Sequence, residues 1–122
     1  MSDVLICDRD RTFAESLEEV LSDWGYAAEV SDVGSRAVQK LLGGTCKMVL
    51  LGVHEEDPDG VEMIPLVHQI DRNLPVVVVG DGVSLDMERR VRLEKVFYYM
   101  VQPVDFDEMR QVVQRALQGK EE

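Results

Sequence analysis

The sequence predicts a single α/β domain built on a doubly wound, five-stranded parallel sheet with five helices. The chain has 122 residues, which is the usual size of one domain. Five short apolar runs alternate along it with five segments of helical periodicity. Such alternation is typical of a parallel sheet that helices cover on both faces through right-handed crossovers. Ligands of these sheets bind at the carboxyl ends of the strands, so we expect functional residues in the loops that follow them.

The first two strand–helix units are marked by apolar runs and glycines. Residues 4–7 are all apolar or small and predict a buried strand. A capping box that begins at Thr12 predicts a helix that ends at Gly25. Residues 26–30 then predict a second strand, and residues 34–42 predict a second helix before a Gly-Gly break.

The third and fourth strands are the most apolar segments of the chain. Residues 47–51 predict the third strand, and residues 76–79 are four valines that predict a central one. The helix between them contains Pro65, which predicts a kink or a late start because proline clashes with the carbonyl four residues back.

The last units follow the same pattern. Ser84 is positioned to cap a fourth helix through about residue 95, and residues 97–101 predict the fifth strand. A second capping box at Asp105 predicts a fifth helix through residue 117. Tyr98 and Tyr99 are successive strand residues, so their rings should point to opposite faces.

Composition excludes several classes of function. The formal net charge is −11, from 13 basic and 24 acidic residues, and the basic residues are scattered, which argues against direct binding of nucleic acid. The longest apolar runs are far short of the roughly 20 residues that span a bilayer, so we expect a cytoplasmic protein without membrane contact. Cys7 and Cys46 lack metal-site spacing and should remain reduced thiols.

No motif indicates an enzyme. His54 and His68 have no partner at metal or catalytic spacing, and no serine lies in a nucleophile elbow. The acidic loop between the third strand and the third helix, with Asp57 and Asp59, is best explained as a turn leading into a helix.

Four segments carry a resemblance to a known family. Residues 4–8 have a buried strand with an acidic end, residues 48–60 have a strand and a loop that ends in Asp-Gly, and residues 75–79 and 99–103 match two further strands. Together they resemble the receiver domain of bacterial two-component response regulators. The resemblance implies a flavodoxin-like fold with strand order 2-1-3-4-5 and a receiver-like domain over residues 1–118. The polar end of the sequence, residues 119–122, is expected to be the start of a linker or tail.

The resemblance also implies a phosphotransfer site, but most of its residues are changed here. In the family, an Asp that ends the third strand attacks a phosphohistidine, two acids after the first strand hold magnesium, and a Thr or Ser and a Lys contact the phosphoryl oxygens. The first acid is present as Asp8, whereas the other four positions hold Arg9, Gly52, Gly80 and Gln102. Glycine provides no nucleophile, and an arginine opposes a divalent ion.

We therefore expect a degenerate pocket that needs no metal or cofactor and performs no catalysis. In it, an ion pair between Asp8 and Arg9 is the simplest expectation. Tyr99 should keep one orientation, inward over Gly80. The pocket is expected to comprise Asp8, Arg9, Asp10, Gly52, His54, Gly80 and Gln102.

The leading hypothesis is a pseudo-receiver that acts in signal transduction or transcription regulation through protein contacts. Its partner would be an output domain in a longer chain, another signalling protein, or a second copy in a homodimer. By resemblance, the docking surface is the face of the fourth helix, fifth strand and fifth helix, although its charges could equally be a solvated surface. Its candidate residues are Arg89, Arg90, Tyr98, Asp107 and Arg110.

Two alternatives have different chemistry. The vacated pocket could sense an anion or a small metabolite through Arg9. A true phosphoacceptor would need Asp10 as a second metal ligand, or Asp57 or Asp59 as the acceptor.

Overall fold

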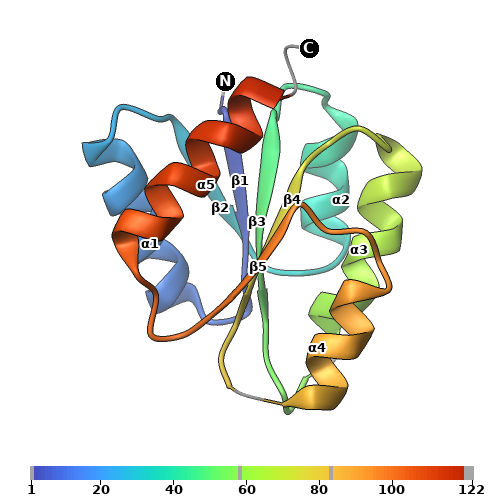
Figure 1. The fold of residues 1–122 in the computed structure, drawn as a ribbon. Coiled ribbons are helices and arrows are strands. Elements are labelled where there is room, and N and C mark those ends of the chain that lie inside the picture. The colour runs from blue at the N-terminus through green and yellow to red at the C-terminus, as the bar shows by residue number, and fades with distance from the viewer. Residues whose placement is uncertain (1, 58, 83, 120–122) are drawn as a thin grey trace.

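The computed structural model describes residues 2–57, 59–82 and 84–119, which form a parallel sheet between two layers of helices (Figure 1). The strands lie in the order β2-β1-β3-β4-β5 and all pairs are parallel, which confirms the predicted topology. In chain order the elements are β1 (Val4–Cys7), α1 (Arg11–Asp23), β2 (Ala28–Ser31), α2 (Ser35–Leu42), β3 (Met48–Val53), α3 (Asp59–Ile70), β4 (Val76–Gly80), α4 (Leu85–Arg92), β5 (Tyr98–Val101) and α5 (Phe106–Gly119).

Each face of the sheet has its own hydrophobic core. Alternate residues of a strand point to opposite faces, so Leu5 and Val49 pack with α2, α3 and α4, whereas Ile6 and Leu50 pack with α1 and α5. Figure 1 shows the same division, with α1 and α5 on one side of the sheet and α2, α3 and α4 on the other. Burial on both faces explains why the central strands are apolar at every position.

The register of the central strands brings three loops to one edge. Cys7 pairs with Leu51, and Val53 pairs with Gly80, so the residues after β1, at the end of β3 and after β4 are neighbours. This edge is the carboxyl end of the sheet, where the sequence placed its candidate pocket.

Two helix boundaries differ from the sequence expectation at their N-termini. Asp10, not Thr12, caps α1, because its carboxylate accepts a hydrogen bond from the Phe13 N–H. The third helix begins early, at Asp59, and continues through Pro65. Its buried residues on both sides of the proline anchor it in the core despite the missing N–H.

The other differences are extensions or shortenings of predicted elements. β3 continues two residues further, through Gly52 and Val53, and β2 starts two residues later, at Ala28. α4 stops at Arg92, three residues short of the expected end, and Lys95 then takes a left-handed conformation with φ of 56°. α5 continues through Gly119, and the rest of the expected linker, residues 120–122, lies outside the described residues.

Cys7 and Cys46 are free thiols, and burial, the largest cause, raises the pKa of Cys7 to about 12.

None of the described helices has the length and apolar composition of a membrane-spanning segment.

Candidate functional site

Asp8 is the buried centre of the candidate site. Its side chain is only 1% exposed, directly after β1. Oδ1 accepts hydrogen bonds from the backbone N–H of Asp10, at 2.9 Å, and from Nε2 of His54, at 2.6 Å. Oδ2 is buried and has no hydrogen-bond partner among the described residues.

Gly52 is the residue that makes room for this carboxylate. A Cβ atom built on Gly52 would lie 1.9 Å from Asp8 Oδ2 and 2.3 Å from its Cγ. Real Cβ atoms essentially never come within 3.0 Å of a heavy atom outside their own residue and its chain neighbours. The Asp8 side chain therefore fills the space that any larger residue at position 52 would need.

His54 joins the ends of three strands. Its Nε2 is bonded to Asp8, after β1, and its Nδ1 lies 2.8 Å from Oδ2 of Asp81, after β4. Ionised carboxylates only accept hydrogen bonds, and a neutral imidazole has a single N–H. With both carboxylates ionised, His54 must donate from both nitrogens and carry a positive charge.

The pKa values of the ring and of Asp81 agree with this charge state. Burial lowers the pKa of His54, but the hydrogen bonds to Asp8 and Asp81 outweigh it, and the net pKa lies above its ordinary value. Burial also acts on Asp81, to raise its pKa, yet hydrogen bonds from His54 and from the Glu55 N–H bring the pKa below its usual range. The geometry therefore favours a positively charged His54 held between the carboxylates of Asp8 and Asp81.

The ion pair between Arg9 and Asp8 that the sequence suggests does not form; Arg9 pairs with Asp57 instead. Its Nη1 lies 2.7 Å from Oδ2 of Asp57, in the loop between β3 and α3, and its side chain is 54% exposed. The Asp57 N–H donates to the His54 carbonyl, so the loop forms a tight turn that holds Asp57 where Arg9 contacts it. The Arg9 charge is thus directed to the rim of the site, while His54 takes the place beside Asp8.

The remaining predicted pocket residues are near this group but have other roles. The carboxylate of Asp10 caps α1. The Tyr99 hydroxyl lies over Gly80, 2.9 Å from the place where a Cβ would be, and burial is the main reason that the pKa of Tyr99 is raised. Gln102 joins the edge through its backbone N–H, which donates to the Gly80 carbonyl at 2.8 Å.

The residues present do not fit a divalent cation. Magnesium prefers an octahedral set of oxygen ligands, several of which are usually water molecules. Here Asp8 Oδ1 is already engaged by two donors, and its Oδ2 faces Gly52. Within the described part of the chain, no three His, Cys, Asp or Glu side chains are grouped so as to hold a metal ion.

Sequence reasoning missed Asp81 and the partners of His54. Asp81 directly follows β4 at the carboxyl edge of the sheet, so its position alone could have marked it as a site residue. The two bonds of His54 span 46 and 27 residues of sequence, and no local pattern predicts them.

Comparisons with known proteins agree on one family. A family model described as the response regulator receiver domain matches residues 4–114. The transcriptional regulatory protein ZraR of Klebsiella oxytoca is 24% identical over 94% of this chain, and the DNA-binding transcriptional regulator NtrC of Azospirillum brasilense is 25% identical over 93%. The chain spans about a quarter of the length of these relatives.

Solved structures show the same fold. A CheY-like receiver domain protein from Methanospirillum hungatei superposes with a TM-score of 0.87 and 19% identity, over 99% of this chain and 97% of the other. The beryllofluoride-activated NtrC4 receiver domain, solved as a dimer, gives a TM-score of 0.86 and 20% identity, over 98% and 99% of the two chains.

Proposed function

Because the chain belongs to the response regulator receiver domain family, we propose that it is a receiver that no longer accepts a phosphoryl group. It acts as a phosphorylation-independent interaction module in two-component-type signalling. The observation that carries this proposal is the packing of Asp8 against Gly52. The resemblance assigns position 52 to the phosphoacceptor aspartate, and the Asp8 carboxylate fills the space which that side chain would need.

The charges around Gly52 support the same conclusion. A phosphoryl group brings negative charge, which a receiver must neutralise with a metal ion and donors. Here the carboxylates of Asp8 and Asp81 both pair with His54, and no other basic side chain in the described ranges pairs with either of them. Arg9 is engaged with Asp57. An incoming phosphoryl group would therefore meet two carboxylates and no uncommitted cation within this group.

These contacts also weigh against the two alternative readings of the pocket. An anion sensor would need Arg9 to face the pocket, but Arg9 bonds to Asp57 at the rim. A rescued phosphoacceptor would use Asp10 as a metal ligand, or Asp57 or Asp59 as the acceptor. The carboxylate of Asp10 caps α1 and that of Asp57 pairs with Arg9, while the side chain of Asp59 lies outside the described part of the structure.

The interaction role rests on what the domain exposes. Arg89, Arg90 and Asp107 are exposed, and the exposed Tyr98 donates its hydroxyl hydrogen to Glu108 on α5. Arg110, by contrast, lies over the ring of Trp24 at the end of α1, with its guanidinium carbon 5.7 Å from the centroid. The candidate face is thus best represented by α4, β5 and the first turn of α5, without Arg110.

The partner is an output domain of a longer chain, another signalling protein or a second copy. The matched relatives are longer regulators of which this chain covers about a quarter, and the NtrC4 receiver was solved as a dimer. These facts support a regulatory module whose effect is transmitted by contact.

The test is phosphorylation of the protein itself. The domain is incubated with magnesium and acetyl phosphate beside a receiver that retains the acceptor aspartate, and intact mass is followed over time. We expect the mass of the control receiver to rise by one phosphoryl group and that of this chain to stay unchanged. A phosphorylated species of this chain would refute the proposal.

Melting temperature tests the metal and the anion separately. A ligand that binds only the native state raises stability as its concentration passes the dissociation constant. Magnesium at millimolar concentration should give no rise over sodium at equal ionic strength, and inorganic phosphate should give none over chloride. A clear rise with magnesium would contradict the proposed loss of the metal site, and a clear rise with phosphate would favour the anion sensor.

A further inference from the structure

A hollow of about 280 Å³ lies at the amino edge of the sheet, opposite the candidate site. Its walls are the end of α3, the α3–β4 loop and the α4–β5 loop, specifically residues 68, 72–76 and 95–97. Its apolar part comes from Leu74 to Val76 and from Val96 and Phe97. We call this hollow the α3–β5 groove.

The charged side chains that line the α3–β5 groove are all basic. Arg72 and Lys95 are exposed at its rim, His68 also lines it, and no acidic residue among those that the structure describes does. Arg72 and Lys95 form no ion pair with any residue in the described ranges. In a chain with a net charge of −11, this groove has the sign opposite to that of the protein as a whole.

The backbone at Lys95 is a second, independent feature. Its φ of 56° lies in the left-handed region. After a helix this conformation usually belongs to glycine, which adopts it without the steric cost of a Cβ atom. The chain therefore accepts a strained turn at the position that presents an ammonium group to the groove.

The loop that carries Lys95 has two large exposed apolar side chains, of which Phe97 lines the groove. Leu93 is 81% exposed and Phe97 is 43% exposed, on either side of Lys95 in the same loop. Exposed apolar groups that gather beside a polar rim mark contact surfaces. This surface combines cations with an apolar floor, so its complement is an anionic segment with an apolar side chain.

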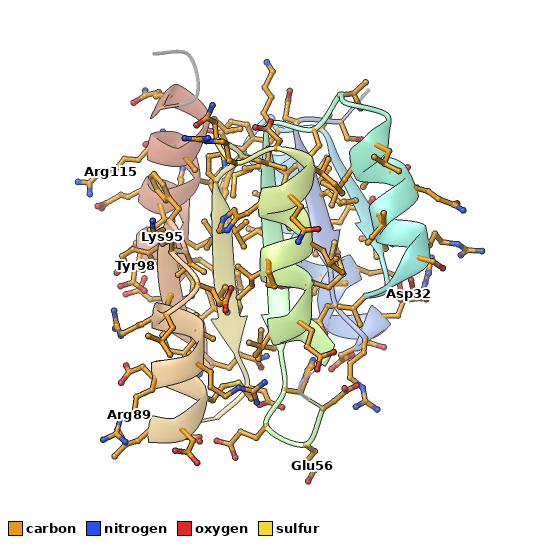
Figure 2. All side chains as sticks on the ribbon, turned by 90° about the vertical axis from the view of Figure 1, so that its right-hand side faces the viewer. Asp32, Glu56, Arg89, Lys95, Tyr98 and Arg115 are labelled. Atoms are coloured by element: carbon orange, nitrogen blue, oxygen red, sulfur yellow. The ribbon has the colours of Figure 1, made fainter. Side chains whose placement is uncertain are left out.

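We propose that the α3–β5 groove binds an acidic peptide segment of a partner protein. Carboxylates of the peptide pair with Arg72 and Lys95, and a large apolar side chain covers Phe97 and Leu93. Nucleic acid is a poorer match, because a net charge of −11 repels a polyanion at long range and the floor is apolar. Lys95 follows the C-terminus of α4, above Arg89 in Figure 2. The groove lies at the amino edge of the sheet, whereas Asp8, Gly52 and Gly80 lie at the carboxyl edge, so this site is separate from the candidate pocket and does not depend on the proposed function.

The experiment is an NMR titration of the isotope-labelled domain with the synthetic peptide EDELFDE, blocked at both ends. We expect saturable shifts confined to residues 68–76 and 93–97. The peptide EDEAADE, which lacks the apolar pair, and QNQLFNQ, which lacks the charges, should each bind at least about tenfold more weakly, a difference of about 1.4 kcal/mol. A short oligothymidylate should give no shifts in the groove.

Lys95→Gly separates binding from folding. It removes the cation and relieves the left-handed turn, so we expect a higher melting temperature together with peptide affinity at least threefold lower. Arg72→Glu should weaken binding further. The matched control is Arg36→Glu, an exposed residue in the first turn of α2, which follows the carboxyl end of β2 and does not line the groove; this variant should bind like the parent.

Several results would overturn the proposal. They are an absence of saturable binding at millimolar peptide, shifts centred outside residues 68–76 and 93–97, unchanged affinity in Lys95→Gly, or binding of the oligothymidylate in the groove.

Discussion

Gly52→Ala should destabilise the domain substantially, although it adds only one methyl group in a strand. The new Cβ would lie 1.9 Å from Asp8 Oδ2, and contacts below 3.0 Å are not tolerated, so the carboxylate must retreat by 3.0 − 1.9 = 1.1 Å or more. Asp8 is almost completely buried, and its other oxygen holds the Asp10 N–H and His54. Retreat therefore strains or breaks at least one hydrogen bond to a charged group.

The magnitude follows from those contacts. A hydrogen bond to a charged group contributes about 1.5–3 kcal/mol, and overpacking a core costs about 1–3 kcal/mol. We expect a loss of about 2–3 kcal/mol in the free energy of unfolding, which for a domain of this size lowers the melting temperature by roughly 6–15 °C. Gly82→Ala is the matched control, because its Cβ would meet only the tip of the exposed Glu55 side chain, 2.7 Å away, which can swing aside.

A double-mutant cycle by urea denaturation identifies the cause. In an Asp8→Ala background the obstructing carboxylate is gone, so Gly52→Ala should then cost no more than about 0.5 kcal/mol. An equal cost of Gly52→Ala in both backgrounds would show that Asp8 is not the obstacle. A cost below about 0.5 kcal/mol with Asp8 intact would refute the packing itself.

Three further results are expected. Because its pKa is raised in the folded state, His54 stabilises the fold fully below its unfolded pKa of about 6.5, and this stabilisation is lost as the pH rises through the folded pKa. The pKa of Asp81 is lowered, so its stabilisation is lost as the pH falls through its own folded pKa. When denaturation midpoints are measured from pH 4 to 9, His54→Gln should remove the fall in stability on the alkaline side. Gly80→Ala should displace the Tyr99 ring at a cost below about 1 kcal/mol, because the obstructing atom is the tip of a side chain; unchanged Tyr99 ring shifts in NMR spectra would contradict this. Asp10→Ala should cost about 1 kcal/mol as the loss of a helix cap, without any change in the response to magnesium.

The sequence was sufficient for the sheet because burial on both faces leaves a local signal. Every residue of β3 and β4 is buried, and such runs are unambiguous when helical segments separate them. Element ends were less predictable, because they depend on competition between neighbours. Asp10 and Thr12 both can cap a helix, and Asp10 takes that role one residue before α1 begins.

The contents of the site were only half predictable. The resemblance identified Gly52 and Gly80 as departures from the family. The space beside Gly52 is filled by Asp8, which follows β1, and the space beside Gly80 is filled by Tyr99 of β5. Which cation would pair with Asp8 could not be predicted. Arg9 is adjacent in sequence, but its side chain leads away from the buried edge to Asp57, while His54 reaches Asp8 across 46 residues.

This arrangement changes which substitution must come first if phosphorylation is to be restored. An arginine directly after Asp8 in the sequence would be expected to pair with the carboxylate that Gly52→Asp introduces. In the structure Arg9 is occupied by Asp57, and the new side chain would instead collide with Asp8, placing two buried carboxylates in contact. Like charges at that separation cannot both ionise readily, so an attacking carboxylate would be lost to protonation or displacement. Freeing Asp8 also requires moving His54, and that leaves Asp81 without its cation. The packing of Asp8 against Gly52 and its pairing with His54 therefore depend on one another. Restoring the nucleophile alone by Gly52→Asp would create strain and uncompensated charge without restoring phosphorylation.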